Sequence, residues 1–307
     1  MKTYKDITII GVDHGYGNIK TANTCFGTGV LAYDREPAFK EDLLHWKDRF
    51  YIIGSGHKEF IADKMKDEDY YVLTLAAIAG ELSITGAYSA NVYLAAGLPL
   101  TWVSEQREEF KRYLLKNNTA DFVFRNKAYH IRFVGADIYP QGFAAIINNI
   151  SEFNGINMLC DIGNGTMNVM YVNNRKPDPG RCFTEKFGTH QCMIQAREKI
   201  MRQHHAEAPE EIVTEVLRTG SADIAPEYLQ TIRATASEYV EGIFLRLREH
   251  GYEPKLMKLY VVGGGGCLIK NFADFEEKRV IINDDICATA KGYERMAELK
   301  LIKGGVY

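Results

Sequence analysis

The chain has 307 residues, 46% of them hydrophobic and 25% charged, which is typical of globular proteins with a substantial core. A formal net charge of −3 argues against broad electrostatic binding to nucleic acid or anionic membranes. The sequence shows neither a signal peptide nor an apolar run of membrane-spanning length, so we expect a cytoplasmic protein. Its six cysteines are widely spaced without a C-x-x-C pair, which predicts neither a zinc site nor a disulfide framework.

The first half of the chain alternates between predicted strands and helices. The predictions in chain order are a hairpin of strands 7–12 and 18–24, a small inserted subdomain with a returning helix at 30–86, a buried strand within 91–100, a helix at 105–115 capped by Ser104, a hairpin at 121–126 and 128–135, and a helix from Pro140 to Ile150. Within the insertion, residues 70–82 are apolar over a helical length.

The second half repeats this alternation. After a second hairpin we expect helices at 191–205, 210–218 and 227–250, a strand at 259–262, a helix starting at Leu268, a strand at 280–282, and a terminal helix to about 299 capped by Asp284 or Asp285. Strand pairs followed by helices, found twice, predict an α/β protein.

Two segments share one pattern: an apolar strand, an aspartate, a turn with two glycines, and a second strand. The aspartates are Asp13 and Asp161, 148 positions apart (161 minus 13), and the glycines are Gly15, Gly17, Gly163 and Gly165. We expect these glycines to take positive φ and to leave the backbone open to a ligand. An ordinary tight hairpin can carry one such pattern. Because turn amides can cradle phosphates, the repetition predicts a duplicated domain with a nucleotide between the copies.

A third glycine run, at residues 263–266, follows an apolar strand and precedes a helix. It can bring the backbone against an adenosine and direct the helix N-terminus at a phosphate, or it can be only a flexible loop. Two aspartates at strand ends suit Mg²⁺ that is otherwise held by waters and phosphate oxygens. Neither the Rossmann G-x-G-x-x-G spacing nor a Walker motif occurs.

The order of these motifs resembles the superfamily of actin, sugar kinases and heat-shock chaperone ATPases over nearly the whole chain. The similar segments are 13–20 (first phosphate motif), 161–166 (second phosphate motif), 262–266 (adenosine motif), and 140–145 with 288–293 (two helices that cross at the hinge). Residues 97–100 and the Ala-x-Ala-x-Gly-Tyr sequence at 288–293 most resemble the ParM/StbA group, the bacterial actin-like proteins of plasmid segregation.

This resemblance implies actin-like (ribonuclease H-like) duplicated α/β domains with a nucleotide cleft between them. Domain I would comprise residues 1–150, with the insertion at about 30–86, and would be completed by a C-terminal helix at 284–307. Domain II would comprise residues 151–283.

The resemblance also assigns site residues. The nucleotide would be bound by Asp13, His14, Gly15, Tyr16, Gly17, Asn18, Lys20, Gly163, Asn164, Gly165, Thr166, Gly263, Gly264, Gly265 and Gly266. Asp13 and Asp161 would hold Mg²⁺ through waters, and Lys20 stands where actin uses a lysine to reach the phosphates. The catalytic residues would be Asp161 with Asp137 or Gln141, one of which orients the attacking water.

Several of these residues have structural alternatives. Asp137 could cap a helix, Gln141 could be a surface residue, Lys20 an edge charge, and His14 a residue that only fills the turn. The sequence also departs from its relatives, because actin has serine where Tyr16 stands and ParM-like proteins have glutamate where Asp137 aligns.

Three functions fit the resemblance. The first is an ATPase, which could also use GTP, that polymerises head to tail and hydrolyses nucleotide in the filament. Its partners would be copies of itself and a DNA-binding adaptor that links filaments to plasmid DNA, with no direct contact to nucleic acid or membrane. The second is a small-molecule kinase with Asp137 as general base, although the Cys-rich zinc motif of many such kinases is absent. The third is a nucleotide-dependent regulator without enzymatic activity.

The insertion offers a candidate contact surface for these partners. Its large apolar residues, Leu43, Trp46, Phe50 and Tyr51, either form such a surface or fill the core of the insertion.

Overall fold

The computed structural model describes residues 1–55, 65 and 68–304. The chain divides into two compact units, Met1–Asn148 with Cys287–Tyr307 (unit 1) and Asn149–Ile286 (unit 2). Each unit contains a sheet with helices packed on it, so the predicted α/β class is confirmed. None of the helices in these described ranges combines the length and apolarity needed to cross a bilayer.

Unit 1 is built on a ten-stranded sheet. Its strands are β1 (Lys2–Tyr4), β2 (Ile7–His14), β3 (Asn18–Lys20), β4 (Cys25–Gly27), β5 (Val30–Tyr33), β6 (Leu43–Trp46), β7 (Arg49–Ile53), β8 (Ser89–Leu98), β9 (Thr119–Phe124) and β10 (Lys127–Pro140). The strand order is β4-β3-β2-β8-β10-β9-β6-β7-β5, and β1 pairs with β2. In its centre, β2, β8 and β10 run parallel, and β3 returns antiparallel to β2.

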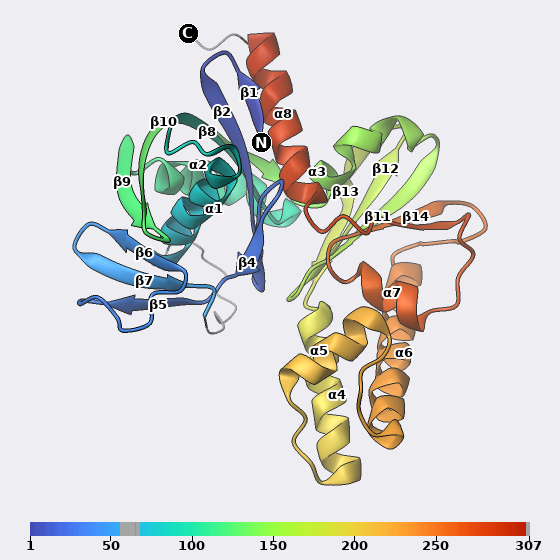
Figure 1. Ribbon diagram of the computed structural model, residues 1–307. Helices are drawn as coiled ribbons and strands as arrows, with labels where there is room; N and C mark the ends of the chain where they lie inside the picture. Colours follow the sequence, from blue (N-terminus) through green and yellow to red (C-terminus); the bar gives the residue numbers. More distant parts are fainter. Residues whose placement is uncertain (56–64, 66–67, 305–307) are drawn as a thin grey trace. The chain divides into compact units, whose positions relative to one another are not determined.

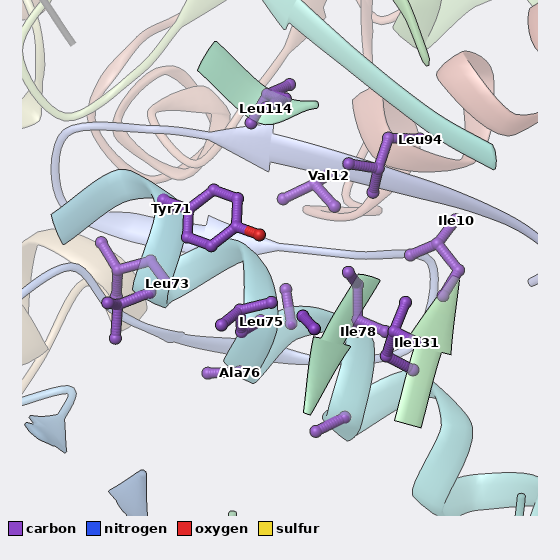
Figure 2. Close-up of a cluster of buried hydrophobic side chains, with 14 of the residues drawn as sticks. Ile10, Val12, Tyr71, Leu73, Leu75, Ala76, Ile78, Leu94, Leu114 and Ile131 are labelled. Carbon is purple, nitrogen blue, oxygen red and sulfur yellow. The ribbon is translucent and has the colours of Figure 1, made fainter. Parts of the chain in front are cut away.

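Helices cover both faces of the central strands of unit 1. They are α1 (Asp69–Thr85), α2 (Leu100–Leu114), the short α3 (Phe143–Ile146) and the C-terminal α8 (Ala288–Gly304). Helix α1 is apolar around most of its circumference, and residues 70–79, 81 and 82 are buried, which confirms the predicted helix at 70–82. Figure 2 shows its side chains close to those of β2 and β8, including Ile10, Val12 and Leu94.

The large apolar residues of the insertion belong mostly to this same core. Leu43, Trp46 and Tyr51 are buried, with Trp46 only 4% exposed, whereas Phe50 is half-buried and stacks on His45. The contact-surface alternative is therefore wrong for all but Phe50, because the other three side chains pack into the interior rather than facing solvent.

Helix α8 lies along β1, β2 and β8 of the unit 1 sheet (Figure 1). Three glycines permit its close approach. A Cβ atom at Gly11 would lie 2.1 Å from the Ala290 carbonyl oxygen, and one at Gly292 would lie 1.8 Å from that of Ala144 on α3. A Cβ at Gly97 would lie 1.9 Å from the Tyr293 hydroxyl. The predicted close packing between the segments 140–145 and 288–293 is thus confirmed at Ala144 and Gly292.

Unit 2 has a five-stranded sheet that repeats part of the unit 1 topology. Its elements are β11 (Ile156–Ile162), β12 (Met167–Asn173), β13 (Lys176–Glu185), β14 (Lys258–Val262), β15 (Val280–Ile282), α4 (Thr189–His204), α5 (Glu210–Thr219), α6 (Pro226–Glu249) and α7 (Gly266–Phe272), with a 3₁₀ turn at Ile147–Glu152 before them. The order β13-β12-β11-β14-β15 matches β4-β3-β2-β8-β10 of unit 1, with the same parallel and antiparallel pairings.

Some predicted boundaries are wrong. Helix α2 begins at Leu100 rather than at 105, because Pro99 supplies the extended residue that precedes the first turn. The predicted helix at 140–150 is instead the end of β10, the short α3 and a 3₁₀ turn. Helix α8 begins at Ala288, three residues beyond the second predicted cap, Asp285. The last three residues of the predicted helix 284–307, and residues 56–64 and 66–67 of the predicted insertion, lie outside the described residues.

A buried carboxyl group on α8 makes the stability of unit 1 depend on pH. Glu294 accepts a hydrogen bond from the Gly11 N–H (3.2 Å), and burial raises the pKa of this carboxyl from 4.5 to about 7, although the N-terminal ammonium group at 3.6 Å opposes the rise. The folded chain therefore binds this proton more tightly than the unfolded chain does. Stability from this group is complete below pH 4.5 and is lost as the pH rises to about 7.

We expect Glu294→Gln, which keeps a neutral acceptor for Gly11, to raise the free energy of unfolding at pH 8 by about 1–3 kcal/mol. At about pH 4 the variant and the wild type should be equally stable, because the carboxyl is then neutral in both states of the chain. Urea unfolding at the two pH values measures the difference. A variant that is less stable than the wild type at pH 8 would contradict the burial argument.

Candidate functional site

The first glycine hairpin places an aspartate opposite a lysine. Asp13 near the end of β2 pairs in register with Lys20 at the end of β3, and the Lys20 Nζ lies 3.6 Å from the Asp13 Oδ2. Asp13 is 7% exposed. The hairpin register therefore fixes one carboxylate and one ammonium group side by side near the carboxyl end of β2.

The turn of this hairpin is held by a threonine that the sequence patterns did not identify. The Thr28 hydroxyl donates a hydrogen bond to the Tyr16 carbonyl oxygen (2.6 Å), and the Thr28 N–H donates to the Gly17 carbonyl (3.3 Å). Gly15 does not take the expected positive φ; its role is steric, since a Cβ there would lie 2.7 Å from the Asn18 carbonyl oxygen.

Gln141 joins this group from the end of β10. Its side-chain Nε2 donates to the Asp13 Oδ1 over 3.3 Å, and its backbone N–H donates to the Leu98 carbonyl at the end of β8 (2.9 Å). Three predicted site residues, Asp13, Lys20 and Gln141, therefore meet in unit 1. The surface-residue alternative for Gln141 does not match this position.

Asp137 lies elsewhere on β10. It is 5% exposed, pairs in register with Ala95, and accepts hydrogen bonds from the Tyr93 hydroxyl (2.8 Å) and the Lys300 ammonium group (2.5 Å). The helix-cap alternative is wrong, because Asp137 is in a strand. Its carboxylate is engaged by side chains that include one from α8, and this arrangement favours Gln141 over Asp137 for a role beside Asp13.

Two other predicted nucleotide-binding residues of this hairpin have side chains that are not open to a ligand. His14 is fully buried, its Nε2 is 2.8 Å from the Thr74 hydroxyl, and its ring packs edge-on against Phe110. Its side chain is therefore part of the core, so only its backbone can contribute to a ligand site. Tyr16 is half-buried as a residue, but its hydroxyl oxygen is fully buried, and burial raises the pKa of this hydroxyl so that it stays neutral at physiological pH.

The second hairpin, in unit 2, has the same register. Asp161 on β11 pairs with Asn168 on β12, as Asp13 pairs with Lys20, so the second hairpin has an amide where the first has an ammonium group. The Gly163 N–H donates to the Thr166 carbonyl and closes the turn (2.8 Å). Like Gly15, Gly163 does not have the expected positive φ.

The glycine run at 263–266 packs against the end of β11, which argues against a flexible loop. Gly263 has φ +85°, and a Cβ there would lie 2.5 Å from the Asp161 Oδ1. The Gly265 N–H donates to the Ile162 carbonyl (2.8 Å). Helix α7 starts at Gly266, the last residue of the run. The predicted second phosphate motif and adenosine motif therefore touch within unit 2.

A further segment contacts the second turn and was missed in the sequence. The N–H groups of Thr189 and His190, at the start of α4, donate to the carbonyls of Gly163 (3.1 Å) and Asn164 (2.9 Å). A Cβ at Gly188 would lie 2.3 Å from the Asn164 carbonyl oxygen. The Gly-Thr pair just before a helical pattern was the available signal.

The Asp13 carboxylate suits a metal ion whose other ligands are mostly water molecules and phosphate oxygens. Across residues 1–55, 65 and 68–304, no three His, Cys, Asp or Glu side chains gather into a metal-binding cluster. Asp13, fixed between an ammonium and an amide group, can bind metal-bound water, and Mg²⁺ with several waters and phosphate ligands fits such a donor set.

Two units that share a five-strand order, each with an aspartate before a glycine turn, define the actin-like fold, and the predicted actin-like α/β fold class is confirmed. Residues 11–143 match the family model described as the N-terminal domain of actin-like proteins. No curated protein matches the chain by sequence.

Solved structures of actin-like proteins are similar along nearly their whole lengths, at identities that establish the fold alone. Alp7A has a TM-score of 0.76 with 16% identity, covering 96% of this chain and 97% of Alp7A. The archaeal actin homologue Ta0583 has a TM-score of 0.74 with 20% identity, covering 95% of this chain and 99% of Ta0583. Bacillus thuringiensis ParM, solved with ATP, has a TM-score of 0.72 with 14% identity, covering 97% of this chain and 100% of that ParM chain.

Two more of these structures show functional states of the respective proteins. Ta0583 was also solved in complex with ADP, with a TM-score of 0.71 and 19% identity over 95% of this chain and 99% of that one. A filament structure of Alp12 has a TM-score of 0.69 with 15% identity, covering 96% of this chain and 99% of the Alp12 chain. The predicted resemblance to actin-like proteins, including ParM, is confirmed.

Substitution of Asp137 tests whether its buried carboxylate has a structural or a catalytic role. Asp137→Ala leaves the hydroxyl groups of Tyr93 and Tyr139 without their acceptor, so we expect it to lower the free energy of unfolding by about 1–3 kcal/mol. Nucleotide affinity should remain that of the wild type. Thermal unfolding and nucleotide titration measure the two effects, with the exposed Asp34→Ala as control. A fully stable Asp137→Ala variant that has lost turnover would instead restore Asp137 as a catalytic residue.

Proposed function

We propose that the chain is a nucleoside triphosphatase that binds ATP, or GTP as well, with Mg²⁺ and assembles into filaments. The observation that supports this most directly is the group formed by Asp13, Lys20 and Gln141 at the glycine turn of unit 1. We also propose that units 1 and 2 are the two predicted actin-like domains, I and II.

In unit 1, each member of the group suits a separate task. The Lys20 ammonium group is positioned to stabilise negative charge on a phosphate, and the turn amides of residues 15–18 offer further donors. The Gln141 amide can both donate and accept, which suits it to orient a water molecule. Phosphoryl transfer depends mainly on such positioning and charge stabilisation.

In unit 2, the contact between Asp161 and the 263–266 run supports a role in the same chemistry. Gly263 and Gly265 let this run pack against Asp161 and Ile162, where a side chain would collide, and the exposed Gly264 between them leaves its backbone open to a ligand. We propose that Asp161, like Asp13, holds a metal-bound water. The Mg²⁺ ion, when bound, would neutralise phosphate charge. That both hairpins serve one nucleotide stays a prediction from the repeated sequence.

Filament formation and plasmid segregation are the finer parts of the proposal. The similar Alp12 chain was solved as a filament, and head-to-tail contacts between identical subunits build open helical assemblies. The resemblance to the ParM/StbA group implies that filaments move plasmid DNA through a DNA-binding adaptor. The net charge of −3 agrees with indirect attachment to DNA.

The assembly prediction is tested by light scattering and negative-stain microscopy after adding Mg²⁺–ATP or Mg²⁺–GTP. We expect polymers from the wild type and from Asp223→Ala, which changes an exposed aspartate of unit 2. Asp161→Ala should show neither Mg²⁺-dependent turnover nor nucleotide-dependent assembly. A wild type that stays monomeric but hydrolyses ATP only with a sugar would favour a kinase.

Gln141 is tested by separating binding from turnover. We expect Gln141→Ala to bind a fluorescent ATP analogue as the wild type does but to hydrolyse ATP at least about tenfold more slowly, because the water is no longer oriented. Gln106→Ala, on α2, is the matched control. Unchanged turnover in Gln141→Ala would remove this residue from the mechanism.

A further inference from the structure

Unit 2 contains a pocket that the proposed nucleotide chemistry does not use. Its volume is ≈ 620 Å³, within the range of small-molecule sites. It lies between the C-terminal half of α6 and the segment that links α7 to β15. None of the residues predicted to bind nucleotide or metal lines it.

Tyr252 lines this pocket and carries a buried hydroxyl group that has no hydrogen-bond partner in the described part of the chain. Tyr252 is 3% exposed, and its Oη forms no hydrogen bond with any described residue. The backbone position is well defined, because the Tyr252 N–H donates to the Leu247 carbonyl (2.8 Å). A buried hydroxyl without a partner is unfavourable, so a ligand that supplied an acceptor would gain from it.

A guanidinium group accompanies this hydroxyl. Arg279 is half-buried, lines the same pocket, and forms no ion pair with any residue in the described part of the chain. Backbone hydrogen bonds fix it on both sides: its N–H donates to the Glu276 carbonyl and its carbonyl accepts from Leu259 (both 2.8 Å). Burial raises the pKa of Tyr252 and nearby Arg279 opposes that rise, so the two groups are close and the hydroxyl remains a donor.

The rest of the wall is apolar, with three aromatic rings among its residues, and the rim is charged. Phe244, Phe272 and Phe275 are half-buried and line the pocket. The other charged lining residues are exposed, and their signs almost balance: Glu241, Asp274 and Glu276 against Arg248 and Lys255. Exposed charges are screened by water and salt, so the half-buried Arg279 dominates the electrostatics inside.

We propose that this pocket binds a small aromatic carboxylate, with its ring against the three phenylalanines and its carboxylate bonded to Arg279 and Tyr252. A guanidinium and a hydroxyl group together offer the donors that a carboxylate accepts, and a carboxylate can take a bidentate bond from arginine. The aromatic lining provides the apolar contact.

Two isosteric probes test the charge requirement: 1-naphthoate and its neutral analogue 1-naphthamide, titrated calorimetrically into the full chain without nucleotide. We expect 1-naphthoate to bind at least about tenfold more tightly than the amide, because only the carboxylate forms a charge-assisted hydrogen bond with Arg279. Equal affinities, or no binding of 1-naphthoate up to about 5 mM, would overturn the proposal.

Variants then locate the site. Tyr252→Phe removes a hydroxyl that has no partner, so it should unfold at the same temperature as the wild type or higher, yet bind 1-naphthoate about five- to tenfold more weakly. Tyr239→Phe is the matched control, because its hydroxyl donates to the Gly188 carbonyl (2.8 Å); it should lose stability but keep probe affinity. Arg279→Gln should bind both probes equally weakly.

The comparison stays decisive if Arg279→Gln fails to fold, because Tyr252→Phe and Tyr239→Phe give opposite patterns of stability and affinity. Unchanged probe affinity in Tyr252→Phe would overturn the site. ATP turnover plays no part in these measurements, so the result is independent of the proposed nucleotide function.

Discussion

The close approach of α8 to the central sheet determines the geometry of unit 1. Gly11 and Gly292 leave no room for a Cβ, so the last helix of the chain lies directly on β2 and α3. Gly11 is two residues before Asp13, and α3 starts two residues after Gln141. The contacts that hold α8 therefore also hold the strand ends that bring Asp13 and Gln141 together.

The repeated hairpins show how one local pattern can recur in two chemical forms. Both place an aspartate near the end of the central strand and a partner directly opposite it. In unit 1 the partner is Lys20, whereas in unit 2 it is Asn168, whose amide oxygen accepts from the Thr184 hydroxyl (2.8 Å). In the hairpin register a lysine thus faces the aspartate of unit 1 and an asparagine faces that of unit 2, which makes the two turns unequal as phosphate sites.

Much of the fold could be predicted because the signals were local. Apolar strands and glycine turns follow from local composition and turn residues, α6 follows from its amphipathic periodicity, and α1 follows from an apolar run of helical length. The end of β10 could not, because it is buried on both faces and a bulge near Val134 interrupts its alternation. Its sequence there resembles the approach to a helix, so the helix-cap alternative for Asp137 was reasonable, although it is wrong.

In the candidate site, too, only the contacts that arise from local structure could be predicted from the sequence. The proximity of Asp13 and Lys20 follows from hairpin register, which a sequence can indicate. The partners of Asp137 could not be found in this way, because Tyr93 lies 44 positions away and Lys300 lies 163 away. Likewise, Trp46 and Tyr51 look available for contacts until the fold places them in the core.

The attachment of α4 to the second glycine turn has a mechanical consequence. Two backbone hydrogen bonds join Gly163 and Asn164 to the first residues of this helix, and Gly188 fits against the same turn without space to spare. A displacement of the turn must either break these bonds or carry the first turn of α4 with it. The 16-residue helix can therefore act as a lever arm that enlarges a small local movement at the turn into a larger one at its far end.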